Sequence, residues 1–363
     1  MADRTADPDK LKFYSYTVFT QLSGAVTAGM IHLGDKLGLF SSLADADSPL
    51  TTTELATRTG LDERWVREWA YNQAAAKLIT AESDDEGIER FWVTPEAVAV
   101  LARPDHPAYG MGMFHRFPQT MGALEQMPSS FVSGLGHDYD SHGPEGAVGI
   151  ERSFEPWNRH NLIPTVLPAL DGVVEALESG ISVADIGCGA GGAILLMADA
   201  FPKSTFVGYD ISGHALERAD KRLAKARVPN ARFVDLRGSQ LPNDHSIDLI
   251  TTFDCIHDMT DPQGMMCKLR EAIAPGGSWL LVDIKARDSF AENVEKNPMA
   301  ALLYGMSILS CMSSALSSPG GAGLGTLGLP ESRAREMAEV AGFTRFRKLD
   351  VDHSVNAFYE IRP

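Results

Sequence analysis

The chain has 363 residues, of which 44% are hydrophobic, and its formal net charge is −16. This length allows two domains with a small third segment, and the apolar fraction is that of a globular protein rather than a disordered one. The acidic balance disfavours binding to polyanions and to anionic membranes, because both need clustered Lys and Arg.

The cysteines, the first residues of the chain and its one long uncharged stretch together predict a protein of the cytoplasm. The four cysteines form no C-x-x-C pair, so neither a structural zinc site nor a redox dithiol is predicted. The polar start M-A-D-R-T-A-D-P-D-K does not read as a secretory leader. The stretch 297–330 has no charged residue, but Ser, Gly and Pro319 interrupt it, which favours a buried helix with a glycine loop over a membrane span.

Residues 10–40 are rich in apolar side chains and are predicted to form helices. Phe13, Tyr16 and Phe19 leave few polar positions there. A helix that is apolar on nearly every side usually packs against a partner, often a second subunit. We therefore expect a homodimer that forms through the N-terminal domain.

Residues 51–102 carry the pattern of a winged helix-turn-helix: a helix that ends at Gly60, a second helix, and an acidic turn that leads into a short strand. Trp65 and Trp69 lie four residues apart, and with Leu61 they are expected to share the buried face of the second helix. Residues 1–102 are thus predicted to form an N-terminal helical and winged-helix dimerisation domain.

The charges of the predicted winged helix disfavour a DNA-binding role. The second helix has as many acids as bases, and the wing at 81–90 sets five acidic residues against Arg90 alone. A wing that lies along phosphates should be basic. Nucleic acid is therefore not expected as a partner.

The remainder of the chain divides into a connector and an α/β domain. Residues 103–180 are rich in Gly, Pro and His and are interpreted as a helical connector or lid, with an amphipathic helix near 161–178. Over 181–363 predicted strands and helices alternate, which implies a parallel doubly wound sheet. Two strands close the chain and predict a terminal hairpin, with one antiparallel strand in the sheet.

The sequence V-A-D-I-G-C-G-A-G-G (183–192) lies between a predicted strand and a helix. Its glycines allow a tight turn and close approach of a ligand, and their spacing alone fits either a dinucleotide or S-adenosylmethionine. Asp185 favours the second, because a carboxylate would repel a pyrophosphate but suits an ammonium group. Asp210 ends the next strand, where a carboxylate accepts both ribose hydroxyls.

The motifs D-I-G-C-G-A-G, G-Y-D-I, F-D-C and A-P-G-G and the final hairpin together resemble class I S-adenosylmethionine-dependent methyltransferases, over about residues 180–363. The resemblance implies a Rossmann-like doubly wound sheet of seven strands and S-adenosyl-L-methionine as cofactor. No metal is expected, because no two histidines of the predicted lid have a ligand spacing such as H-x-x-x-H. Where many relatives place an acid for the adenine, this chain has Arg237, so Asp235 or the neighbouring backbone is expected there. The expected cofactor contacts are Asp185, Gly187, Cys188, Gly189, Gly191, Asp210, Ile211, Asp235, Leu236, Phe253 and Asp254.

After the fourth strand, the string I-H-D-M-T-D-P resembles the H-D-W-x-D-x motif of small-molecule O-methyltransferases with an N-terminal winged-helix dimerisation domain. The resemblance implies that His257 is the general base for an acceptor hydroxyl, and Asp258 is a candidate to orient its ring. Met259 replaces the usual Trp, and the usual later acid is not evident. A role for His257 as a loop cap stays open, and so does a thiol acceptor, which would rely less on a base.

The methyl acceptor is expected to be a small molecule. Tyr304, Ser307 and Cys311 in the uncharged stretch are candidates to contact it, although core packing explains each of these three equally well. Trp157 and Asn161, ahead of the catalytic domain, are candidates to contact the acceptor or the methionine end of the cofactor. The alternative function is a winged-helix transcriptional regulator whose methyltransferase-like domain senses a ligand, which the acidic wing disfavours.

Overall fold

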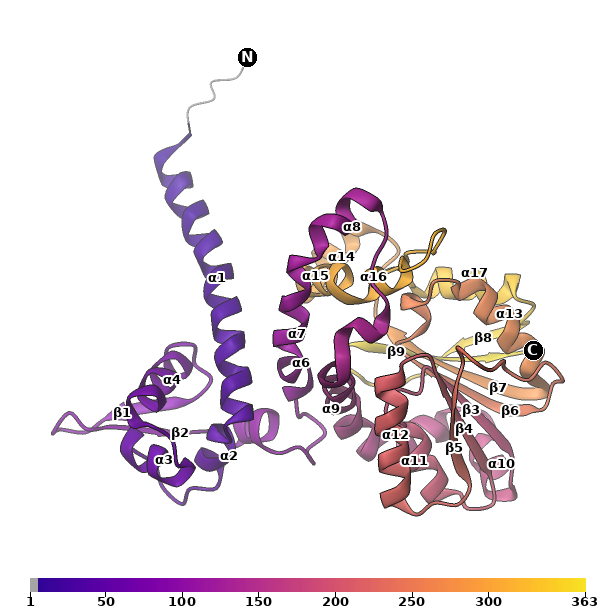
Figure 1. Ribbon diagram of the computed structural model, residues 1–363, viewed down its shortest axis with the longest axis horizontal. Coiled ribbons are helices and arrows are strands. Elements are labelled where there is room, and N and C mark those ends of the chain that lie inside the picture. Colours follow the sequence, from indigo (N-terminus) through magenta and orange to yellow (C-terminus); the bar gives the residue numbers. More distant parts are fainter. Residues whose placement is uncertain (1–5) are drawn as a thin grey trace. The chain divides into compact units, whose positions relative to one another are not determined.

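The computed structural model describes residues 6–363, which form two compact units that divide between Pro118 and Gln119 (Figure 1). The division falls inside the segment that was predicted to be a connector. Each unit has its own hydrophobic core, so each is described by itself.

The first unit contains the predicted winged helix. The capping box of Thr51 and Glu54 begins α3, which ends where Gly60 takes a left-handed conformation. The second helix, α4, follows, and β1 and β2 then pair as an antiparallel wing. The elements are α1 (Pro8–Lys36), α2 (Leu39–Ala44), α3 (Thr52–Thr59), α4 (Glu63–Ala75), β1 (Thr80–Ser83), β2 (Glu89–Trp92), α5 (Pro95–Ala97), the π-helical turn η1 (Val98–Ala102) and α6 (Met111–His115).

The buried face of α4 differs from the predicted one. Trp69 is buried as expected, and its Nε1 donates a hydrogen bond to the Met30 carbonyl at 2.9 Å. Trp65, however, is 80% exposed, so its predicted packing is wrong. Positions spaced by four drift around a helix of 3.6 residues per turn, and a buried stripe alternates steps of three and four. The buried side chains of α4 follow that stripe: Val66, Trp69, Ala70 and Gln73.

Helix α1 leaves its apolar side chains exposed over its N-terminal half. Phe13 is 72% and Phe19 68% exposed. The C-terminal part of α1 belongs to the core, where Gly34 lies so close to Phe40 and Trp69 that a Cβ would be 2.6 and 2.7 Å from their rings. Only part of this helix is therefore covered by its own unit.

The second unit begins with a helical layer that includes α7, which crosses the division. The amphipathic helix predicted near 161–178 is interrupted: a π-helical and a 3-10 turn end at Ala169, and α10 starts only after Gly172, which adopts a positive φ. Pro164 and Pro168 within these turns remove backbone donors that a regular helix needs. The elements are α7 (Phe117–Gly122), η2 (Ala123–Glu125), α8 (Met127–Ser133), η3 (Tyr139–His142), α9 (Gly143–Asn161), η4 (Leu162–Val166), η5 (Leu167–Ala169) and α10 (Val173–Ser179).

A seven-stranded sheet in the order β5-β4-β3-β6-β7-β9-β8 forms the centre of the second unit. Strands β3 to β7 are parallel, and β9 is antiparallel to both its neighbours, as the terminal hairpin predicted. The strand β7 begins earlier than expected, because A-P-G-G is extended. The strands are β3 (Ser182–Ile186), β4 (Thr205–Asp210), β5 (Ala231–Asp235), β6 (Ile247–Phe253), β7 (Ile273–Ile284), β8 (Arg345–Lys348) and β9 (Asn356–Arg362).

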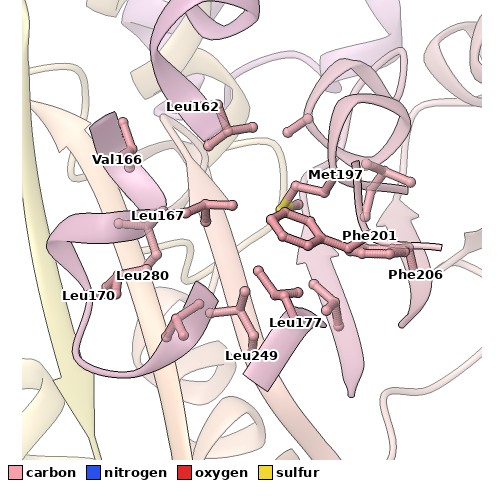
Figure 2. Close-up of a cluster of buried hydrophobic side chains, with 14 of the residues drawn as sticks. Leu162, Val166, Leu167, Leu170, Leu177, Met197, Phe201, Phe206, Leu249 and Leu280 are labelled. Atoms are coloured by element: carbon pink, nitrogen blue, oxygen red, sulfur yellow. The ribbon is translucent and has the colours of Figure 1, made fainter. Parts of the chain in front are cut away.

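Helices cover both faces of this sheet. The remaining elements are α11 (Gly192–Ala200), α12 (Gly213–Ala226), η6 (Ile256–Asp258), α13 (Pro262–Ala272), α14 (Phe290–Lys296), α15 (Ala300–Met306), η7 (Ser307–Cys311), α16 (Met312–Ala315) and α17 (Glu331–Val340). Alternate strand residues enter two cores, because successive side chains of a strand point to opposite faces. Leu249 and Leu280 meet η4, η5, α10 and α11 in one core (Figure 2), and Ile250 and Leu281 meet α13 and α17 in the other.

The strand order reverses beside β3, because β4 and β5 lie on one side of it and β6 and β7 on the other. Ligands of open α/β sheets bind at the carboxyl ends of the strands at such a reversal. Within residues 6–363, no helix combines the length and the apolar character that crossing a membrane would require.

Candidate active site at the carboxyl edge of the sheet

The glycine loop connects β3 to α11 and folds against the end of β4. The amides of Gly187 and Cys188 donate to the Tyr209 carbonyl at 2.8 and 3.0 Å. Gly191 has a φ of +75° and packs on Phe233, whose ring would lie 2.3 Å from any Cβ at this position. Backbone conformation and close packing therefore both require glycine at the entry to α11. The Cys188 thiol is buried, and burial raises its pKa.

Asp210 closes the loop from the end of β4. Its two carboxylate oxygens accept the amides of Gly189 at 2.7 Å and Ser212 at 2.8 Å. Burial raises the pKa of Asp210 despite these hydrogen bonds. Since each oxygen accepts one bond in this way, each keeps a further acceptor position. The site thus offers a buried, backbone-positioned acceptor pair, which fits a vicinal diol such as a ribose. Ile211, which follows, is exposed.

Asp185 lies deeper than the loop, inside the sheet. It is 1% exposed and accepts a hydrogen bond of 2.7 Å from the Thr251 hydroxyl. Burial raises its pKa to about 7, although the Thr251 bond acts in the opposite direction. A nearby cation would favour the charged form of this carboxyl.

The end of β5 carries an ion pair that the sequence analysis did not foresee. Arg237 donates to the Asp235 carboxylate at 2.8 Å and lies 3.3 Å from Asp140. Asp140 also accepts the Gly213 amide at 3.0 Å at the start of α12. Asp140 comes from η3 in the helical layer, so no local pattern connects it to the sheet. The Leu236 amide, for its part, donates to the Asp210 carbonyl at 2.9 Å.

The segment after β6 turns sharply before it reaches His257. Phe253 is half-buried at the strand end, and Asp254 adopts a φ of +48° and accepts a hydrogen bond from Asn356 on β9. Burial, together with the charge of Asp283, raises the pKa of Asp254 to about 7. Cys255 donates to the Ile186 carbonyl at 3.1 Å, which ties this segment to β3.

His257 and Asp283 form a buried pair. Each is 2% exposed, and Nδ1 of His257 donates to the Asp283 carboxylate at 2.6 Å. Burial lowers the pKa of His257, but the neighbouring Asp283 and Cys311 outweigh this effect, and the pKa is raised overall. The acceptor of the ring's hydrogen bond is thus Asp283 on β7, whereas the sequence predicted Asp258 for this role. Asp283 was not among the residues predicted from the sequence.

Asp258 and Cys311 border the same ring. A ring nitrogen of His257, a carboxylate oxygen of Asp258 and Sγ of Cys311 all lie within 4.8 Å of one another. Burial raises the pKa of Asp258 to about 7. Cys311 ends the π-helical turn η7, a type of turn that occurs often at functional sites. Of the acceptor-contact candidates, Cys311 is therefore the one that the structure brings to His257.

The other acceptor candidates take part in packing and local hydrogen bonds. Trp157 meets the His353 ring edge-on at 4.6 Å, and Asn161 donates to the Trp157 carbonyl one turn earlier in its helix. Tyr304 packs near Phe290 at 5.9 Å, and the Ser307 hydroxyl accepts the Thr326 amide at 3.2 Å. A cavity of about 170 Å³ borders η7, because Leu309 of that turn lines it. Its other lining residues include Gln119, Gly122, Gln126, His137, His142 and Ser313.

Comparison with known families gives a match in each of two parts of the chain. Residues 177–327 match the family described as a methyltransferase domain, and residues 25–103 match the Rv2258c-like winged HTH domain. The first match contains the glycine loop, Asp210, His257 and Cys311. The second covers the helices and hairpin of the predicted winged helix.

Individual proteins are similar to the chain, and the first relatives are matched over less than half of their own length. Trans-aconitate 2-methyltransferase of Variovorax paradoxus is 33% identical over 101 residues, which are 28% of this chain and 38% of that protein. Methyltransferase ungE' of Aspergillus campestris is 31% identical over 242 residues, 65% of each chain. The structure of human N-acetylserotonin methyltransferase superposes with a TM-score of 0.66 at 16% identity and covers 99% of both chains.

The fold and the two domain matches define what the chain contains: a methyltransferase domain of Rossmann-like fold, preceded by a winged helix-turn-helix domain. This confirms the fold class that the sequence predicted. In fold, the chain is similar to solved structures of O-methyltransferases.

Proposed function

We propose that this protein transfers the methyl group of S-adenosyl-L-methionine to an oxygen of a small molecule, with His257 as the general base. The observation that carries the proposal is the buried His257–Asp283 pair, which lies at the same edge of the sheet as the glycine loop. When bound, the cofactor supplies an electrophilic methyl group on a sulfonium. A sulfur acceptor is the nearest variant, because a thiol ionises more easily than a hydroxyl.

In this proposal the glycine loop and Asp210 hold the cofactor. Asp210 accepts the ribose hydroxyls at the positions that the Gly189 and Ser212 amides leave available. Asp185 attracts the ammonium end from beneath the loop, and the cation favours its charged form. At the adenine end the Asp235 carboxylate is already paired with Arg237, so an ion pair, rather than a free acid, borders the base.

His257 accepts the proton of the acceptor hydroxyl at Nε2. Asp283 holds the Nδ1 proton, which fixes the tautomer that exposes the Nε2 lone pair and stabilises the imidazolium that forms. Burial of the pair excludes water, which strengthens this interaction. The role of this chain is therefore to position one base opposite the methyl group and to keep its tautomer fixed.

The experiment compares His257→Ala with Asp210→Ala, using a radiolabelled methyl donor and a panel of phenols, alcohols and thiols. We expect His257→Ala to lower turnover by about 10²–10⁴ and to keep its affinity for S-adenosylhomocysteine in calorimetry. Asp210→Ala should lose that affinity. His106→Ala in the first unit, an exposed histidine, is the matched control.

Full turnover of His257→Ala on an oxygen acceptor would contradict the base assignment. Methyl transfer to thiols but not to alcohols or phenols would contradict an oxygen acceptor and favour a sulfur acceptor. Unchanged affinity of Asp210→Ala would refute the ribose assignment.

We do not propose the DNA-binding regulator. The wing residues 82–89 are exposed, and they include five acids. Such a hairpin would repel a phosphate backbone. A gel shift with genomic fragments at low salt that showed tight, sequence-selective binding would favour the regulator instead.

A further inference from the structure

Three side chains around the proposed base have the donor atoms of a metal site. They are the His257 ring, the Asp258 carboxylate and the Cys311 thiol, and their ligand atoms all lie within 4.8 Å of one another. His257 is buried and the other two are half-buried. Two separate elements supply them, η6 and the π-helical turn η7, so their proximity results from the tertiary structure rather than from neighbouring sequence alone.

The surroundings of His257 also suit metal binding. Histidine ligands of metals almost always donate their other ring N–H to a carboxylate or carbonyl, which orients the ring and raises its basicity. Asp283 accepts the Nδ1 proton of His257 at 2.6 Å, which leaves Nε2 as the ligand atom. The second oxygen of Asp283, Oδ2, is buried without a hydrogen-bond partner. The negative charge of this buried carboxylate lies next to the His257 ring and favours a cation bound there.

We propose that His257, Asp258 and Cys311 bind a thiophilic divalent cation of the Zn²⁺ class. Nitrogen, carboxylate oxygen and thiolate sulfur are the three kinds of ligand that zinc takes in proteins, and three protein ligands leave one position open. A thiolate ligand also disfavours Mg²⁺ and Ca²⁺, which prefer oxygen donors. Binding displaces the thiol proton to solvent, and the cation takes the Nε2 lone pair.

The consequence rests on the proposed function. The cation and the acceptor proton compete for the same lone pair of His257. A bound cation therefore prevents His257 from accepting a proton, and Zn²⁺ inhibits methyl transfer.

Cobalt titration of the full chain tests the site directly, because a Co²⁺–thiolate bond gives a charge-transfer band in the near ultraviolet. We expect wild-type protein to develop this band and saturate at one Co²⁺ per chain, and Zn²⁺ to bleach it. Cys311→Ser should abolish the band, and Asp258→Asn should weaken Co²⁺ affinity at least about tenfold, the usual order for loss of a metal-site group.

Cys267→Ser is the matched control, since Cys267 lies on α13 and is half-buried like Cys311. It should keep both the band and the affinity. Circular dichroism establishes that each variant is folded. A wild-type protein without the band, or a folded Cys311→Ser that keeps it, overturns the proposal.

The binding measurement needs no methyl transfer, so the two proposals fail separately. Methyl transfer that is insensitive to Zn²⁺, in a protein without the cobalt band, refutes the metal site and leaves the methyltransferase proposal standing. A cobalt band that depends on Cys311, in a protein without transfer to any acceptor, supports the metal site and refutes the methyltransferase proposal.

Discussion

At the scale of single residues, the motifs predicted where Asp210 and His257 lie, while their roles stay predictions. Asp210 ends β4 and His257 follows β6, each within a recognisable string of residues. Asp283 lies on β7, 26 residues after His257 in the turn η6, yet donor and acceptor are 2.6 Å apart. The alternation of side chains along β7 predicts only which face of the sheet Asp283 lies on, and it does not predict a contact with His257. The role of Asp283 depends on the pairing of β6 with β7, which places the two strand ends together.

Replacement of Asp283 by asparagine tests its positioning role. We expect Asp283→Asn to lower kcat by about 10²–10⁴, the range typical of impaired general-base catalysis, with little change in KM or in S-adenosylhomocysteine affinity. Steady-state kinetics and calorimetry separate these quantities. Asp248→Asn, which removes the charge of the carboxylate that accepts the Ser182 amide at the other end of the sheet, should leave kcat unaffected. A fall in cofactor affinity that matches the fall in kcat would contradict a role confined to His257.

Gly191 offers a test of the loop itself. Gly191→Ala combines a φ of +75° with a Cβ placed 2.3 Å from the Phe233 ring. We expect a loss of about 2–5 kcal/mol in stability, from left-handed strain and overpacking together, and weaker binding of S-adenosylhomocysteine. Gly134→Ala has a similar φ of +73° with nothing within 4 Å, so it should lose only about 1–2 kcal/mol. Equal losses in scanning calorimetry would show that the Phe233 contact is unimportant.

At the scale of elements, caps and turns were predictable where the local chemistry decides them. The capping box at Thr51 and the stop at Gly60 are examples. The buried face of α4 and the interruption of the helix after Ala169 were not predictable in this way, because they depend on which neighbours cover each side chain. The terminal hairpin was predicted, but the polar network that fastens it to β7 was not: Glu360 on β9 bonds Ser278 at 2.7 Å and lies beside Arg347 and Arg362.

This network predicts a pH-dependent contribution to stability. Burial raises the pKa of Glu360, but its hydrogen bonds from Arg347, Ser278 and Arg362 outweigh burial, so the pKa is lowered overall. The contribution is therefore present above the unfolded pKa of a glutamate and is lost as the pH falls through the lower folded value.

We expect Glu360→Gln to cost about 1–3 kcal/mol at neutral pH, less than for a fully buried pair because Arg347 is half-exposed. The difference from wild type should shrink as the pH falls below 4. Denaturant unfolding at several pH values measures it. Glu217→Gln breaks an exposed pair with Lys221 and should cost no more than about 0.5 kcal/mol. A difference that stays constant with pH would contradict the ionic origin.

At the scale of the whole molecule, the two units have separate cores, and α1 has a face that its own unit does not cover. The exposed apolar side chains on α1 include Leu11, Phe13, Tyr14, Tyr16, Phe19 and Leu22. Exposed apolar patches of this kind mark interaction sites. The dimer that the sequence predicted stays a prediction, and this face is where we expect it to form.

Phe19→Glu tests the dimer. A buried unpaired charge opposes association, so we expect wild-type protein to elute as a dimer and Phe19→Glu to shift towards monomer in size-exclusion chromatography with light scattering. Phe131→Glu alters an equally exposed aromatic residue on α8 and should remain dimeric. A monomeric wild type, or a dimeric Phe19→Glu, would contradict the assignment.

The amino-acid sequence alone determined the order of the elements, the doubly wound sheet with its terminal hairpin, the glycine loop and the placement of His257 after β6. Each of these depends on local periodicity, on turn residues or on the end of a strand, which short stretches of chain specify. Only the tertiary structure decided that Asp283 holds the histidine, that Cys311 and Asp258 border it, and that Asp140 meets Arg237. Those contacts join distant segments, and they form only when strand pairing and helix packing bring the segments to one edge of the sheet.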